Sequence, residues 1–145
     1  MQGRKRPHVA TGGLAALAVL LIWYGCASAP PPSNVKKIDC KGACIQWEIA
    51  PEAEIVHFAC ALGTHQGDPS LIYTVQLKNV ADQAHRFRLT VYLMDMKKAV
   101  SYLVPTKGKP PQLAPGEETT IKIPFMKTTA MSKKALVRVV SMASE

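Results

Sequence analysis

The sequence predicts an all-β protein, a sandwich of about seven strands that follows an N-terminal signal or anchor segment. Three observations predict it. Short segments of high β-propensity recur along residues 38–145 and are separated by turn residues. The clearest of these segments alternate apolar and polar side chains with a period of two. The chain has 145 residues, and the roughly 110 that follow the N-terminal segment match the size of an immunoglobulin-like sandwich.

Residues 1–29 have the pattern of an export signal or a membrane anchor. The basic cluster Arg4-Lys5-Arg6 precedes an apolar run over residues 14–24. This charge asymmetry would hold the N-terminus in the cytoplasm. Residues 30–37 begin with three prolines and are predicted to form a stiff linker. We therefore expect three parts: a signal or anchor at 1–29, a linker at 30–37 and the sandwich at 38–145.

The end of the N-terminal segment has three interpretations. Cys26 follows a glycine and precedes small residues, as in a bacterial lipobox, which makes Cys26 a candidate for lipidation. Residues 9–29 are mostly uncharged and long enough to span a membrane as an uncleaved anchor. Residues 27–29 (ASA) also fit an ordinary cleavage site that would release a soluble domain. We favour the lipoprotein over the spanning anchor, and expect a tethered domain on the periplasmic side of a bacterial envelope.

Alternation is clearest in the middle of the chain. In residues 71–77, Leu71, Tyr73 and Val75 share one face, and residues 86–93 repeat the pattern with Phe87 and Leu89. Residues 63–69 are rich in turn formers and are predicted to be a loop, and residues 127–134 a loop or one helical turn. The seven predicted strands are residues 44–49, 54–62, 71–80, 86–95, 100–104, 118–125 and 135–142.

Three short motifs lie at the ends of these segments. They are residues 75–79 (VQLKN), 91–95 (VYLMD) and 113–117 (LAPGE). Together they resemble the FxLYD-type Ig-like domains of bacterial envelope proteins. The resemblance covers about 70 residues, roughly 71–140, and implies a sandwich fold and an envelope location. Such domains share no common active site, so the resemblance supplies no catalytic residues.

The four cysteines are Cys26, Cys40, Cys44 and Cys60. Exported proteins meet an oxidising compartment, where cysteines pair. If residues 44–49 and 54–60 form a hairpin around Glu52, Cys44 and Cys60 face each other, so we favour a Cys44–Cys60 disulfide. Cys40–Cys60 and Cys40–Cys44 are the alternatives. With Cys26 lipidated or in an anchor, three cysteines remain and one thiol is left over.

The leftover thiol supports an alternative function, a periplasmic protein that binds a soft metal such as copper(I). Cys40, Cys44 and Cys60 would supply sulfur ligands, with His57 or His65 beside them. The spacing fits no zinc pattern, and the methionines are scattered along the chain rather than clustered. We therefore rank metal binding below a disulfide and expect no cofactor.

The sequence indicates that the protein is not an enzyme. It contains no nucleophile elbow, no phosphate-binding glycine loop and no dinucleotide fingerprint. The net charge is +8, but no arginine-rich stripe with interleaved aromatic residues predicts nucleic-acid binding. We expect a non-enzymatic, membrane-tethered module that binds a protein partner through an edge strand or loop. Such a module would suit an accessory subunit of a larger membrane assembly.

Overall fold

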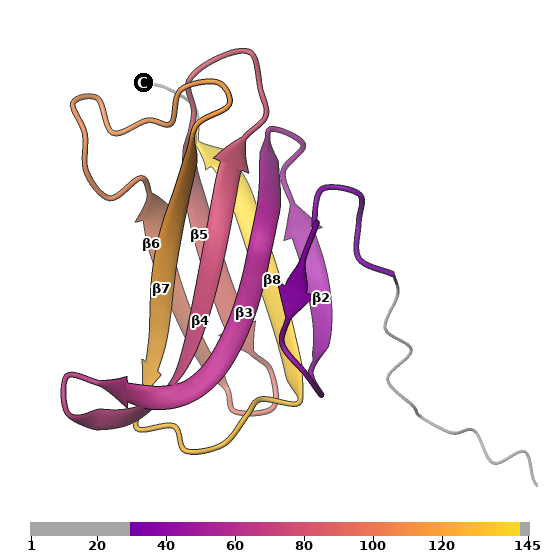
Figure 1. The fold of residues 1–145 in the computed structure, drawn as a ribbon, viewed down its shortest axis with the longest axis vertical. Helices are drawn as coiled ribbons and strands as arrows, with labels where there is room; N and C mark the ends of the chain where they lie inside the picture. The colour runs from indigo at the N-terminus through magenta and orange to yellow at the C-terminus, as the bar shows by residue number, and fades with distance from the viewer. Residues whose placement is uncertain (1–29, 143–145) are drawn as a thin grey trace, which may run out of the picture.

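The protein folds as a two-layer β-sandwich in the computed structural model, which describes residues 30–142 (Figure 1). No helix occurs in this part of the chain, and the predicted all-β sandwich is confirmed, with eight strands rather than about seven. The strands are β1 (Ile38–Asp39), β2 (Cys44–Ile49), β3 (Ala53–His65), β4 (Asp68–Asn79), β5 (Arg86–Leu93), β6 (Lys98–Val104), β7 (Glu118–Met126) and β8 (Lys134–Met142).

The strands form two sheets of four. Sheet A has the order β1-β3-β4-β7, and sheet B has the order β2-β8-β5-β6. The β3–β4 and β5–β6 hairpins are antiparallel, whereas β1 pairs with β3 and β2 pairs with β8 in parallel. The first two strands therefore lie at the edges of different sheets, and the N-terminal part of the domain bridges the two layers (Figure 1).

The core lies between the sheets and follows the predicted alternation. Inward-facing residues of β4 and β5 are fully buried, because every second side chain of a strand points to the same face. A row of aromatic rings crosses the core: Trp47 meets Phe58 at 5.1 Å between ring centroids, and Tyr73 lies 5.4 Å from Phe58 and 5.7 Å from Phe125. These edge-on and tilted contacts are the arrangements that aromatic pairs prefer.

The predicted loop over residues 63–69 is wrong. β3 and β4 run on to His65 and Asp68 and are joined by Gln66 and Gly67, whose φ angles are 53° and 86°. Two central residues with positive φ make a tight hairpin turn whose twist matches that of the flanking strands. Pro69 is tolerated in β4 because β7 begins to pair only at Ser70, so no ladder bond to β7 is lost.

Part of the predicted linker belongs to the folded domain. Val35 is buried and forms a parallel bridge with Ile55, and the Ile55 N–H donates to the carbonyl oxygen of Asn34 at 2.8 Å. Lys36 and Lys37 continue this pairing along β3. β1 was not predicted from the sequence. Its two residues extend the pairing of residues 34–37 with β3.

Candidate functional site

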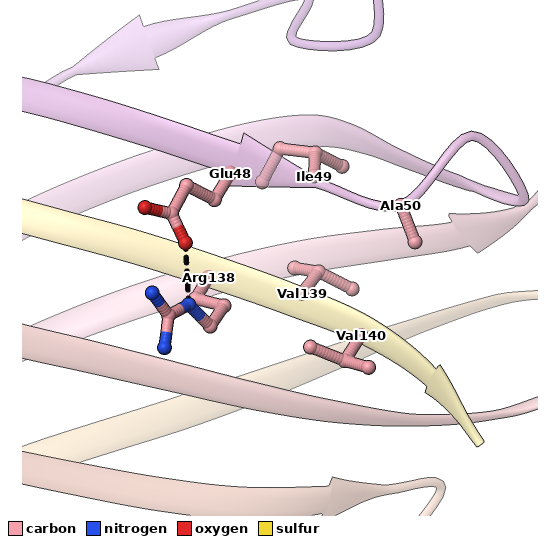
Figure 2. Close-up of a pocket in the computed structure, with 6 residues that line it drawn as sticks. All are labelled: Glu48, Ile49, Ala50, Arg138, Val139 and Val140. Atoms are coloured by element: carbon pink, nitrogen blue, oxygen red, sulfur yellow. Dashed lines mark hydrogen bonds and ion pairs between the residues drawn. The ribbon is translucent and has the colours of Figure 1, made fainter.

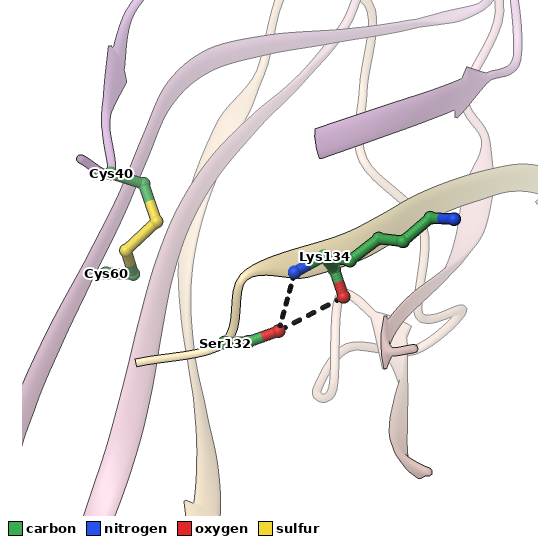
Figure 3. The surroundings of a disulfide bond; sticks show 4 residues. All are labelled: Cys40, Cys60, Ser132 and Lys134. Carbon is green, nitrogen blue, oxygen red and sulfur yellow. Dashed lines mark hydrogen bonds between the residues drawn. A yellow bond between two sulfur atoms is a disulfide. The ribbon is translucent and has the colours of Figure 1, made fainter. Parts of the chain in front are cut away.

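A disulfide joins Cys40, just after β1, to Cys60 in β3 (Figure 3). The two Cα atoms lie 5.0 Å apart, within the range that disulfides adopt. The bond closes a loop with a sequence separation of 20 residues. It therefore fastens the short β1 covalently to the strand beside it.

The favoured Cys44–Cys60 pairing is wrong, and the alternative Cys40–Cys60 is the one formed. The prediction assumed a hairpin around Glu52, but the chain crosses there from one sheet to the other. Cys44 lies in sheet B opposite Lys134, and Cys60 lies in sheet A opposite Tyr73. The two cysteines therefore never share a ladder.

The predicted leftover thiol is not found, since no cysteine of residues 30–142, Cys44 included, is free. For the copper hypothesis, the sulfurs of Cys40 and Cys60 are bonded to each other rather than present as thiolates, the form that ligates soft metals. His65 lies at the end of β3 opposite Asp68. Within the described residues, no three His, Cys, Asp or Glu side chains are grouped as a metal site.

Polar side chains reinforce the junction of β1 and β3 on its outer side. The Asp39 carboxylate lies 3.0 Å from Lys37 Nζ and 2.7 Å from His57 Nε2. Hydrogen bonds from Lys37 and then His57 hold the pKa of Asp39 below its usual value. The contacts lie at the surface, so they orient β1 more than they stabilise the fold.

The motif residues that resemble an envelope domain have structural roles. Asn79 is fully buried, and its side-chain amide donates to the carbonyl oxygens of Gln83 at 2.7 Å and Leu113 at 2.9 Å. Its side-chain oxygen accepts from the Ala81 N–H at 3.0 Å. Asn79 therefore ties the β4–β5 connection to the segment before β7 at one end of the sandwich.

Asp95 plays the matching role at the other end. Its carboxylate accepts from Ser132 Oγ at 2.6 Å and from the Lys133 N–H at 2.8 Å, and Ser132 in turn bonds the Lys134 backbone (Figure 3). Burial alone would raise the pKa of Asp95, but hydrogen bonds led by Ser132 outweigh it and keep the pKa low. Asp95 thus fixes the loop that leads into β8.

The outer edge of β3 changes character along the strand. β1 covers it up to Ala59, and beyond Cys60 it has no neighbouring strand among residues 30–142. The Phe58 N–H donates outward to Lys37. Because edge groups repeat every second residue, the N–H and C=O groups of Leu62 and Thr64 also point away from β4. We call residues 61–65 of β3 the open edge.

The open edge lacks the features that normally protect a strand edge. Charged side chains and prolines discourage pairing with other chains, but the run from Ala59 to Thr64 contains neither. The Leu62 side chain is 48% exposed although its partner Leu71 is fully buried. By contrast, the opposite edge strand of sheet A, β7, carries Lys122 and Pro124.

Sequence reasoning did not find the open edge as a site. The sequence signal was present in the uncharged run over residues 59–64, but the predicted strand stopped at residue 62 and its neighbours were unknown. Whether a strand lies at an edge depends on the order of strands in the sheet. That order could not be predicted here, because the chain crosses between sheets near Glu52, where a hairpin was expected.

Two predicted features lie outside the described residues: the lipidation candidate Cys26 and the signal or anchor at residues 1–29. Among residues 30–142, no helix long and apolar enough to cross a membrane is found.

Comparison with known proteins identifies no similar protein. The chain matches no protein-family model, no curated protein and no solved structure.

Proposed function

We propose that this protein is a non-enzymatic, membrane-tethered module of a bacterial envelope that binds a protein partner by strand addition at the open edge. The observation that carries the proposal is the uncharged edge of β3 beyond Cys60, which has no neighbouring strand within residues 30–142. An extended segment of the partner would become the next strand of sheet A. This recognition mode uses main-chain hydrogen bonds for affinity and side-chain contacts for specificity.

The position of the open edge supports this mode. Because the Cys40–Cys60 disulfide and β1 end where the open edge begins, an added strand would continue the line of β1 along β3. The exposed Leu62 offers an apolar contact beside the free backbone groups. We further propose that the N-terminal segment anchors the domain, in the manner of an FxLYD-type lipoprotein, as an accessory subunit of a larger membrane-associated assembly.

The test places a photo-crosslinking amino acid at Leu62 in the full chain and recovers crosslinked products from intact membranes. Met94 is the matched control, because its side chain is also 48% exposed but lies in the turn after β5. We expect one discrete product with a different protein from position 62 and none from position 94.

A second variant tests the backbone contribution. Thr64→Pro removes an N–H that points away from β4, so the β3–β4 ladder stays intact while the added strand loses a hydrogen bond. The crosslink from position 62 should then disappear. Recovery of the protein as an uncrosslinked monomer, equal crosslinking from both positions, or a crosslink to a second copy of the same chain would each contradict the proposal.

A further inference from the structure

The three arginines of residues 30–142 lie on one face of the molecule, the outer face of sheet B. Arg86 and Arg88 are in β5, and Arg138 is in the neighbouring β8. In the ladder, Arg88 pairs with Val140 and Arg138 pairs with Thr90, so the two arginines are diagonal neighbours. We call Arg86, Arg88 and Arg138 the arginine face.

Most of the positive charge of this face has no partner. Arg138 forms an ion pair with Glu48 of β2, which is the only acidic residue among the outward positions of the sheet B strands (Figure 2). Arg86 and Arg88 have no ion pair within the described chain, and Arg86 Nε is buried without a hydrogen-bond partner. A buried donor without an acceptor is rare in folded proteins.

The outer face of sheet A provides the contrast. There, Lys36 lies 3.2 Å from Glu54 and Lys78 lies 3.5 Å from Glu118. Two lysines on this side are thus paired with acidic side chains, whereas on the arginine face only Arg138 is.

An apolar surface adjoins the arginine face. Val140 is 45% exposed and lines a shallow hollow of about 370 Å³ together with Ile49, Ala50 and Val139, and the Glu48–Arg138 pair forms its rim (Figure 2). The Arg138 guanidinium also lies 5.7 Å from the centre of the Tyr92 ring. Arginine and tyrosine beside apolar side chains are typical of the centre of protein interfaces.

We infer that the arginine face binds a carboxylate-bearing protein segment, with an apolar side chain of that segment in the hollow beside Val140. The choice of arginine supports a protein partner over an anionic lipid surface. Residues 30–142 contain 12 lysines and only three arginines, yet all three arginines are on this face. The guanidinium fork matches a carboxylate in two hydrogen bonds, whereas a lipid surface attracts lysine equally well. This surface lies on the opposite sheet from the open edge, so the inference goes beyond the proposed strand addition.

The test measures binding of a fluorescein-labelled decaglutamate peptide to the full chain in nanodiscs of zwitterionic lipid at low salt, by fluorescence anisotropy. We expect Arg88→Gln and Arg138→Gln each to weaken binding about threefold, the effect of an exposed ion pair. Lys122→Gln is the matched control, because Lys122 is an exposed residue on the outer face of sheet A. It should leave the affinity unchanged, as should Leu62→Lys at the open edge.

Arg88→Gln carries the test because its exposed side chain can change without disturbing the core, and unchanged near-ultraviolet circular dichroism would show that the variant is folded. Peptide binding that Arg88→Gln leaves intact, or that Lys122→Gln weakens equally, would overturn the inference. A membrane role would also overturn it. A membrane role would be indicated if anionic nanodiscs protected residues 136–142 from hydrogen exchange, if this protection needed the arginines, and if the peptide did not bind.

Discussion

The two halves of β3 have opposite surroundings. From Ala53 to Cys60, the strand has β4 on one side and residues 34–40 on the other, with a disulfide at the end. From Ala61 to His65, it keeps β4 but has no strand on its outer side within the described chain. The side chains follow the same division: Phe58 is fully buried, and Leu62 is about half exposed.

One continuous ladder can thus be covered along part of its length and exposed along the rest. The β3–β4 register runs unbroken from the bulge near Val56 to the tip, so the change cannot come from the hairpin itself. It comes from the short β1, which stops at Asp39. Where the neighbouring strand ends, the same backbone becomes available to another chain.

The largest effect should come from truncating the core side chain of the covered half. Phe58→Ala removes a ring that contacts both Trp47 and Tyr73, and should lower the free energy of unfolding by about 3–5 kcal/mol. Urea denaturation followed by tryptophan fluorescence measures this, since Trp47 lies beside the site. Leu62→Ala, in the open half, should cost about 0.5 kcal/mol or less. Similar losses for the two variants would remove the distinction between the halves.

The disulfide should have the next largest effect. Replacing Cys40 and Cys60 together by serine frees β1 from β3 and should cost about 2–4 kcal/mol, because the unfolded chain regains the freedom of the closed loop. In hydrogen exchange, the Phe58 N–H should lose protection when β1 detaches. If the protection of the Phe58 N–H and the free energy of unfolding both stay unchanged, β1 stays paired with residues 53–60 of β3 without the disulfide.

A pH dependence should distinguish Tyr73, the β4 partner of Cys60. Burial raises the pKa of Tyr73 to about 12, whereas an unfolded tyrosine ionises near 10. Above pH 10 the unfolded state therefore loses its proton first, and stability falls by about 2 kcal/mol as the pH rises to 12.

The variant Tyr73→Phe should abolish this part of the alkaline loss. At pH 7 it should change stability little, because the buried hydroxyl has no hydrogen-bond partner within the described chain. Denaturation curves of both proteins at pH 7 and at pH 10 to 12 make the comparison, and an identical alkaline decline in the variant would contradict the expectation.

The smallest effect on stability should come from charging the open edge. Leu62→Lys keeps the alkyl stem and places an ammonium group in solvent, so the free energy of unfolding should change by no more than about 0.5 kcal/mol. Strand addition should nevertheless be blocked, because a lysine on an edge strand opposes pairing. A loss of stability comparable to that of Phe58→Ala would show that Leu62 belongs to the core.

Strands with strong alternation could be predicted from the sequence. β5 starts at Arg86 as expected, because its apolar and polar side chains alternate across a sheet with one buried face. β1 could not be predicted, since two residues carry no periodicity and the strand exists only through its parallel pairing with β3. In β8, Leu136 faces outward, opposite Tyr92, while Val137 faces the core.

The candidate sites were less predictable than the strands. The cysteine pairing depends on which sheet each strand joins, and the turn residues Pro51 and Glu52 fit a crossover as well as a hairpin. The arginine face could not be predicted from the sequence, because Arg138 is distant in sequence from Arg86 and Arg88 and lies beside them only through the β5–β8 ladder. The motif residues Asn79 and Asp95 could be picked out from the sequence, but the loops that they hold emerge only from the fold.

The position of the disulfide also determines how the domain responds to mechanical force. A pull on the chain at Pro30 would first peel residues 34–39 from the edge of β3, one hydrogen bond at a time. The extension would then stop at Cys40, where the tension passes through a covalent bond into β3. Residues 34–39 span roughly 20 Å when fully extended. Tension beyond that point acts on β3, which its long antiparallel ladder with β4 holds in sheet A.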